Sequence, residues 1–208
     1  MRTVALILLA AVGLLTGCVT RQPFTYNYPP KSNVTGSASL AALPATDRRA
    51  GTNELDKVLF IPSGLDEIFI REIRSTGKFA DVVRVNPLAP GKDFLLEASL
   101  LQLDWEIPKH DQMVGTAFGV SLLTGGVGGI IYGSTKTTIF GRAQIAFKVS
   151  NPVNNRIILE KQYSSEVSER VAKLNCDTPA AGRRLAGLAV KAVMDQFKQD
   201  LNKTPLDQ

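Results

Sequence analysis

The stretch from Ile139 to Val149 alternates its side chains so regularly that it constrains the fold more than any other part of the chain. One parity is apolar or small and consists of Ile139, Gly141, Ala143, Ile145, Phe147 and Val149. A period of two predicts a strand with one buried face and one solvent-facing face. The turn formers of 151–155 follow, and Arg156 to Val167 has the pattern of a second strand. We therefore expect an antiparallel hairpin whose apolar face is covered by another layer.

The C-terminal region is expected to supply that cover. Thr178 is an N-cap residue, and Pro179 stands at the first helical position, where proline is favoured. An apolar stripe follows over a helix of about 20 residues. Its members are Leu185, Leu188, Ala189, Ala192, Val193, Gln196 and Phe197.

Residues 57–107 add strands and one more helix. Lys57 to Pro62 has a buried-strand pattern, and Ser63 with Asp66 resembles a capping box at a helix start. The helical spacing of that segment ends at Gly77 and is carried by Leu65, Ile68, Phe69, Glu72 and Ile73.

Two strands are expected after this helix. Val82–Val85 is short, and 93–107 is longer, with one apolar parity formed by Leu95, Leu101, Leu103, Trp105 and Ile107. The order of elements predicts an α/β fold, a two-layer sandwich with a mixed sheet of about five strands and two main helices.

The passage Ser75-Thr76-Gly77-Lys78-Phe79-Ala80-Asp81-Val82-Val83 resembles one in the amino-terminal domain of TolB. A group of outer-membrane lipoproteins shares the pattern: the curli secretion lipoprotein, the activator lipoproteins of penicillin-binding proteins, and the lipoprotein of Pel exopolysaccharide export. The resemblance implies the same fold and an accessory role in an envelope transport or secretion machine.

Residues 1–17 are arranged as a secretory signal peptide. Arg2 supplies a positive charge, and the apolar run that follows is too short to span a bilayer. Leu15-Thr16-Gly17-Cys18 resembles the lipobox of bacterial lipoproteins, which implies cleavage before Cys18 and acyl chains on that residue. Val19 stands where the inner-membrane retention signal of enteric lipoproteins would place Asp, so the resemblance implies export to the outer membrane if the host is Gram-negative. The alternative is an ordinary cleaved signal with a cysteine nearby.

The remaining chain divides into three parts. Residues 18–52 are rich in Pro, Ser, Thr and Asn and predict a lipid-anchored, disordered, flexible tether in which Tyr26 and Tyr28 are loosely packed. Residues 53–203 form the periplasmic α/β domain, with a Gly-rich apolar insertion at 112–135. Residues 204–208 are a tail.

The insertion carries no charge from Gln112 to Thr135 and permits three interpretations. It is a flexible loop between two strands, a segment that contacts the membrane or packs an oligomer, or a single membrane-spanning helix. The last is disfavoured because the strands on either side are expected to be neighbours. Gly-x-x-x-Gly spacing favours close packing of helices in lipid. The predicted membrane or oligomer contacts are Gly115, Phe118, Gly119, Leu122, Leu123, Gly125, Gly129, Ile130 and Gly133.

The sequence lacks the motifs of catalysis. His110 is the only histidine, and no Cys-x-x-Cys pair, nucleophile elbow or phosphate-binding loop accompanies it, so neither a cofactor nor a metal is expected. The cations behind the net charge of +5 are scattered, without the basic stripe that nucleic acid needs. Cys176 is either buried or paired with another chain.

These observations predict a non-catalytic, lipid-anchored outer-membrane lipoprotein that serves as a binding or assembly component. Its expected partners are the membrane, through acyl chains on Cys18, and an envelope protein or further copies of itself. The alternative is an oligomeric secretion channel whose pore is built from segment 113–135.

Overall fold

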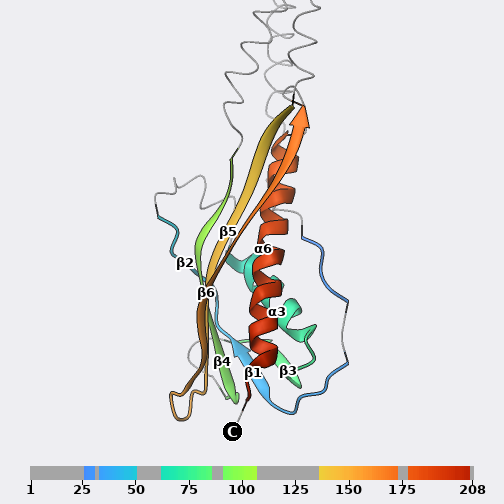
Figure 1. The fold of residues 1–208 in the computed structure, drawn as a ribbon. Helices are drawn as coiled ribbons and strands as arrows, with labels where there is room; N and C mark the ends of the chain where they lie inside the picture. Colours follow the sequence, from blue (N-terminus) through green and yellow to red (C-terminus); the bar gives the residue numbers. More distant parts are fainter. Residues whose placement is uncertain are drawn as a thin grey trace, which may run out of the picture.

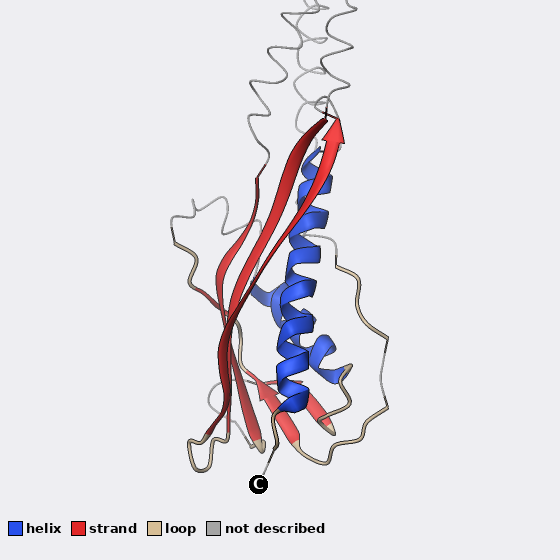
Figure 2. Ribbon diagram, in the orientation of Figure 1, coloured by secondary structure: helices blue, strands red, loops and turns tan. Residues whose placement is uncertain are grey.

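The computed structural model describes residues 26–30, 33–50, 62–85, 91–106, 136–172 and 178–206. In these residues, one mixed sheet of six strands is covered on one side by two helices (Figures 1 and 2). The elements are β1 (Ser39–Ala42), β2 (Thr46–Asp47), α3 (Pro62–Arg74), β3 (Asp81–Arg84), β4 (Phe94–Glu106), β5 (Lys136–Ser150), β6 (Ile157–Ala172) and α6 (Thr178–Lys203). The predicted two-layer α/β class is confirmed.

The sheet order is β3-β1-β4-β5-β6, with β2 paired to β4. Strand β1 runs parallel to β3 and β4, whereas β4, β5 and β6 are antiparallel neighbours. The expected hairpin is therefore present, and the expected apolar parity of β5 is buried from Ile139 to Val149. Strand β6 continues to Ala172, beyond the predicted end at Val167.

The apolar parity expected for β4 is wrong in its first half. The buried residues there are Phe94, Leu96, Ala98 and Leu100, whereas Leu103 is buried on the opposite parity. A register shift between Leu100 and Gln102 separates the two halves. One extra residue in a strand reverses which side chains face the helices, so no single parity describes β4.

Strands β1 and β2 lie inside the range 18–52 that was expected to be a tether. Leu40 and Ala41 are fully buried, and β1 occupies the position between β3 and β4. Four residues are too short a run to show a sequence period, which is why the pattern indicated no strand here. Of the expected strand from Lys57 to Pro62, residues 57–61 lie outside the described residues, and Pro62 begins helix α3.

Helix α3 buries the predicted stripe but begins at Pro62, one residue before the expected cap at Ser63. Asp66 does not close a capping box. Its Oδ1 accepts a hydrogen bond from the Ala45 N–H at 2.7 Å, and its Oδ2 lies 2.8 Å from Arg84. Gly77 follows the helix with a φ of 69°, which a glycine adopts without strain.

Helix α6 packs against β5 and β6 through an aromatic centre. Phe147 stacks on Phe197 with ring centroids 4.2 Å apart and meets Phe69 edge-on at 5.2 Å. Leu188, expected in the buried stripe, is instead 39 % exposed. At the N-terminal half of α6 the helix backbone lies directly on β5, because a Cβ on Gly141 would stand 2.3 Å from the Leu185 carbonyl carbon.

Candidate functional site

All site residues predicted from the sequence lie outside the described residues. They are Cys18, Gly115, Phe118, Gly119, Leu122, Leu123, Gly125, Gly129, Ile130 and Gly133. Their roles in lipidation and in membrane or oligomer contact remain predictions.

The structure does place the two ends of segment 107–135. Strand β4 ends at Glu106, which pairs with Phe140 of β5, and β5 begins only four residues earlier at Lys136. The segment therefore leaves and re-enters the sheet at the same end, as expected for neighbouring strands. Neither helix in the described part of the chain is long and apolar enough to cross a membrane.

A buried carboxylate joins the N-terminal segment to both helices. Glu72 of α3 has no exposed side-chain surface and accepts a hydrogen bond from the Tyr26 hydroxyl. Lys198 of α6 forms an ion pair with its Oε2, and Lys191 lies 3.4 Å from its Oε1. Asp195 completes this Glu72 cluster, 2.9 Å from Lys198 and 3.7 Å from Lys191.

The cluster is electrostatically balanced, because two lysines face two carboxylates. Burial raises the pKa of the Tyr26 phenol, and the hydrogen bond to Glu72 raises it further, so the hydroxyl keeps its proton and donates. Burial alone lowers the pKa of Lys198, but hydrogen bonds to Glu72 and Asp195 outweigh it, and the net direction is upward. The cluster thus fixes Tyr26 against the helix layer, and the expectation of a loosely packed tail is wrong at this residue.

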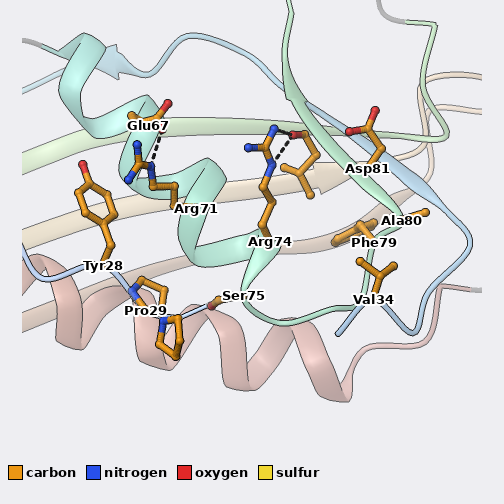
Figure 3. Close-up of a pocket in the computed structure, with 12 residues that line it drawn as sticks. Tyr28, Pro29, Val34, Glu67, Arg71, Arg74, Ser75, Phe79, Ala80 and Asp81 are labelled. Carbon is orange, nitrogen blue, oxygen red and sulfur yellow. Dashed lines mark hydrogen bonds and ion pairs between the residues drawn. The ribbon is translucent and has the colours of Figure 1, made fainter. Parts of the chain in front are cut away.

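A pocket of about 610 Å³ lies beside this junction, between the N-terminal segment, α3 and the turn into β3 (Figure 3). Tyr28 and Pro29 form one wall, and Arg71 and Arg74 of α3 lie between them and β3 (Figure 3). The complete lining is Tyr28, Pro29, Pro30, Val34, Glu67, Arg71, Arg74, Ser75, Phe79, Ala80, Asp81 and Val82.

The polar groups of this pocket already have partners. Arg71 Nε lies 2.5 Å from Glu67 Oε1, and its guanidinium carbon lies 4.3 Å from the centre of the Tyr28 ring. Arg74 donates to the Val82 carbonyl oxygen from Nε at 2.9 Å and from Nη2 at 2.6 Å. These contacts hold the pocket walls together. None of them places a nucleophilic side chain beside a general base.

The passage that resembles TolB has a structural role here. The Lys78 ammonium donates to the carbonyl oxygens of Leu201 and Thr204 at the C-terminal end of α6. Burial lowers the pKa of Lys78, and Phe79 and Val82, which follow it in the chain, enter the core. Because Lys78 binds Thr204, the expected tail at 204–208 begins with a residue that still contacts the domain.

The described residues contain no group of three or more His, Cys, Asp or Glu side chains that could hold a metal ion. The Glu72 cluster was missed by sequence reasoning. A signal was present, since Glu72 falls in the apolar stripe of a helix, and an acidic residue in that position needs a buried partner.

No family model matches this sequence, and no curated protein matches it. Solved structures that resemble the chain include a homolog of the neuraminyllactose-binding hemagglutinin from Helicobacter pylori, with 12% identity and a TM-score of 0.49 over 86% of this chain and 94% of that one. A PelC dodecamer from Paraburkholderia phytofirmans shares 9% identity, with a TM-score of 0.38 over 81% and 98%. A minor lipoprotein from Acinetobacter baumannii shares 11%, with a TM-score of 0.38 over 81% and 96%. Similarities at this level identify neither a family nor a function.

Proposed function

We propose that this chain is a lipid-anchored lipoprotein of the outer membrane and that its domain is a non-catalytic binding and assembly component of a cell-envelope transport or secretion machine. The observation that carries the proposal is the signal-like N-terminus ending in Leu15-Thr16-Gly17-Cys18. Two or more acyl chains on Cys18 would anchor the protein stably.

The contact of Tyr26 with Glu72 supports this function because it limits the length of chain between the acylated Cys18 and the domain. Tyr26 is the eighth residue after Cys18, and a fully extended chain spans about 3.4 Å per residue, so the two residues can lie at most about 27 Å apart. Because Tyr26 is held against α3 and α6, the helix layer rather than the open sheet face would lie nearest the membrane.

The contacts in and beside the pocket support a non-catalytic domain, because its polar groups are engaged in holding elements together. Arg71 pairs with Glu67 within α3, Arg74 joins α3 to the Val82 carbonyl oxygen of β3, and Glu72 joins α3 to α6. The resemblance to TolB and to envelope lipoproteins supports the finer assignment to a transport or secretion machine.

The test compares Cys18→Ser with Cys176→Ser, expressed in a Gram-negative host. We expect the wild type and Cys176→Ser to remain with the outer membrane after a high-salt wash and to carry acyl mass on the N-terminal peptide. Cys18→Ser should lose both properties. Equal membrane retention of the two variants, with no acyl mass on the N-terminal peptide of either, would exclude the lipid anchor.

A second candidate is an oligomeric secretion channel with a pore from segment 113–135. It is favoured by the uncharged stretch from Gln112 to Thr135 with its Gly-x-x-x-Gly spacing, and both ends of that stretch meet at one end of the sheet. Single cysteines along 115–133 in a Cys176→Ala background, treated with a water-soluble maleimide in intact outer-membrane vesicles, distinguish the two functions. Uniform labelling supports the adaptor, whereas a protected block together with rings in detergent supports the channel.

A further inference from the structure

Strand β6 forms a long edge of the sheet. In the described part of the chain it pairs only with β5, whereas the opposite edge is the four-residue β3 (Figure 1). A sixteen-residue edge presents a row of backbone donors and acceptors that another strand can pair with. One of these groups, the Ser164 carbonyl oxygen, receives a 3.3 Å hydrogen bond from Gln196 of α6.

Four of the five charges of β6 are arranged symmetrically about Ser165, and the fifth, Glu166, pairs with Arg142 of β5. Glu160 lies five residues before Ser165 and Arg170 five after it, while Lys161 lies four before and Glu169 four after. If two copies of β6 pair antiparallel with Ser165 opposite Ser165, Glu160 faces Arg170 and Lys161 faces Glu169. By symmetry each pair occurs twice, and opposite charges facing each other across strands are favourable.

Adjacent registers lack this match. A shift of one residue places Glu160 opposite Glu169, or Lys161 opposite Arg170, and both arrangements bring like charges together. A one-residue shift would also turn the second copy over, so that its helix layer lay on the other side of the sheet. Shifts of two residues keep both helix layers on one side, but they lose both facing pairs, and one of them places Glu166 opposite Glu166. The charge pattern therefore favours the register about Ser165.

We propose that β6 is a homodimer interface in which two copies pair antiparallel about Ser165 and form one continuous sheet. The inference deepens the proposed function, on which it rests, by naming a second copy as the partner that binds the sheet edge. The twofold axis of such a pair is perpendicular to the sheet, so both helix layers lie on the same side. Both N-terminal segments, held on the helix layers by Tyr26, then face one membrane.

Contacts within each copy already hold two of the four symmetric charges. Lys161 Nζ lies 2.8 Å from Asp200 of α6, and Glu169 pairs with Arg184 of α6. In the dimer Lys161 of one copy would face Glu169 of the other, so Asp200, Lys161, Glu169 and Arg184 would follow one another with alternating sign across the interface. In the described residues Glu160 and Arg170 make no ion pair, although their side chains are exposed on β6.

Cysteine cross-linking tests the register in the full chain with Cys176→Ala. Directly opposite residues in an antiparallel pair have Cα atoms about 4.5–5.5 Å apart, within the range of a disulfide. Ser165→Cys should therefore give a covalent dimer on mild oxidation in membrane vesicles. Ser168→Cys is the matched control, because it faces Gln162 of the second copy and stands about 20 Å from its own counterpart. The Cys176→Ala chain alone gives the background from Cys18.

Charge exchange tests the pairing without a new bond. Glu160→Arg and Arg170→Glu should each weaken dimerisation by about tenfold, since each places two like-charge pairs at the interface. The double variant should restore it. An equimolar mixture of the two single variants should also dimerise, because every facing pair in the heterodimer is again Glu opposite Arg.

Several results would overturn the pairing. These are a protein that is monomeric at all concentrations, single variants that dimerise as well as wild type, or a Ser165→Cys cross-link to another protein instead of to itself. Unchanged thermal unfolding of each variant shows that the fold is intact. None of these results bears on the anchor, because acylation of Cys18 is measured separately, and loss of the anchor leaves the dimerisation of the detergent-solubilised chain testable.

Discussion

The two faces of strand β5 carry phenylalanines in very different surroundings. Phe147 on the helix-covered face is 1 % exposed and lies among Phe69, Tyr163 and Phe197. Phe140, on the open face of the same strand, is only partly buried, and the Arg142 guanidinium carbon lies 5.6 Å from its ring centre. Phenylalanine in one strand is therefore part of the hydrophobic core on one face, and on the other face it lies beside charged side chains that form ion pairs. Whether a side chain of β5 contributes to the hydrophobic core therefore depends on the layer that covers its face of the sheet.

Replacing Phe147 and Phe140 one at a time by alanine tests this difference most directly. Phe147→Ala should lower the free energy of unfolding by about 3–5 kcal/mol, because it leaves a cavity between the sheet and α6. Phe140→Ala should cost less than about 1.5 kcal/mol, since solvent already reaches that side chain. Urea denaturation of the two variants measures both values. Equal losses would mean that the open face is covered by something in the folded protein.

Substituting the buried Glu72 tests how much the ion pairs of the helix layer contribute to stability. Glu72→Gln leaves Lys191 and Lys198 with Asp195 as the one remaining carboxylate of the cluster. We expect a loss of about 2 kcal/mol, less than for a fully buried pair because both lysines keep some solvent contact. Glu67→Gln, one turn earlier on an exposed part of α3, should cost under about 0.5 kcal/mol. The Glu72 cluster would be dispensable if the two substitutions gave the same urea midpoint.

The closeness of the two layers predicts a clash at Gly141. A methyl group there would stand 2.3 Å from the Leu185 carbonyl carbon, so Gly141→Ala should cost about 1–3 kcal/mol as α6 is displaced from β5. Gly91→Ala is the matched control, because nothing lies within 4 Å of the position that its new methyl group would take, and it should change stability by less than about 0.5 kcal/mol. Thermal unfolding compares the two, and a stable Gly141→Ala variant would contradict the close approach.

The smallest effect is expected on the open face. Lys148 Nζ lies 3.1 Å from Glu97 Oε1 with both side chains well exposed, and such pairs contribute about 0–1 kcal/mol. Lys148→Ala should therefore lower stability slightly in dilute buffer and not measurably in about 1 M salt, where the charges are screened. A loss that persists in high salt would show that Lys148 acts through packing.

Strong periodicity made parts of this fold predictable. The alternation in β5, the turn at 151–155 and the stripe of α3 each follow from local spacing, and the structure has all three. The prediction failed where the spacing is short or interrupted. Strand β1 has four residues, and the bulge after Leu100 reverses the parity of β4 in mid-strand.

The candidate site was much less predictable than the fold. The Tyr26 hydroxyl reaches a carboxylate 46 residues away, and the two lysines come from the last helix, so no local pattern could place them together. The sequence-predicted residues, Cys18 and those of segment 115–133, lie outside the described residues and stay predictions.

The α/β class, the hairpin, the two helices and the lipobox-like start could be predicted because each depends on residues close together in the chain. The covered face of the sheet, the position of β1 and the contact of Tyr26 became visible only in the folded domain, because they depend on contacts between distant segments. Burying Glu72 requires partners, and Tyr26, Lys191 and Lys198 come from two such segments.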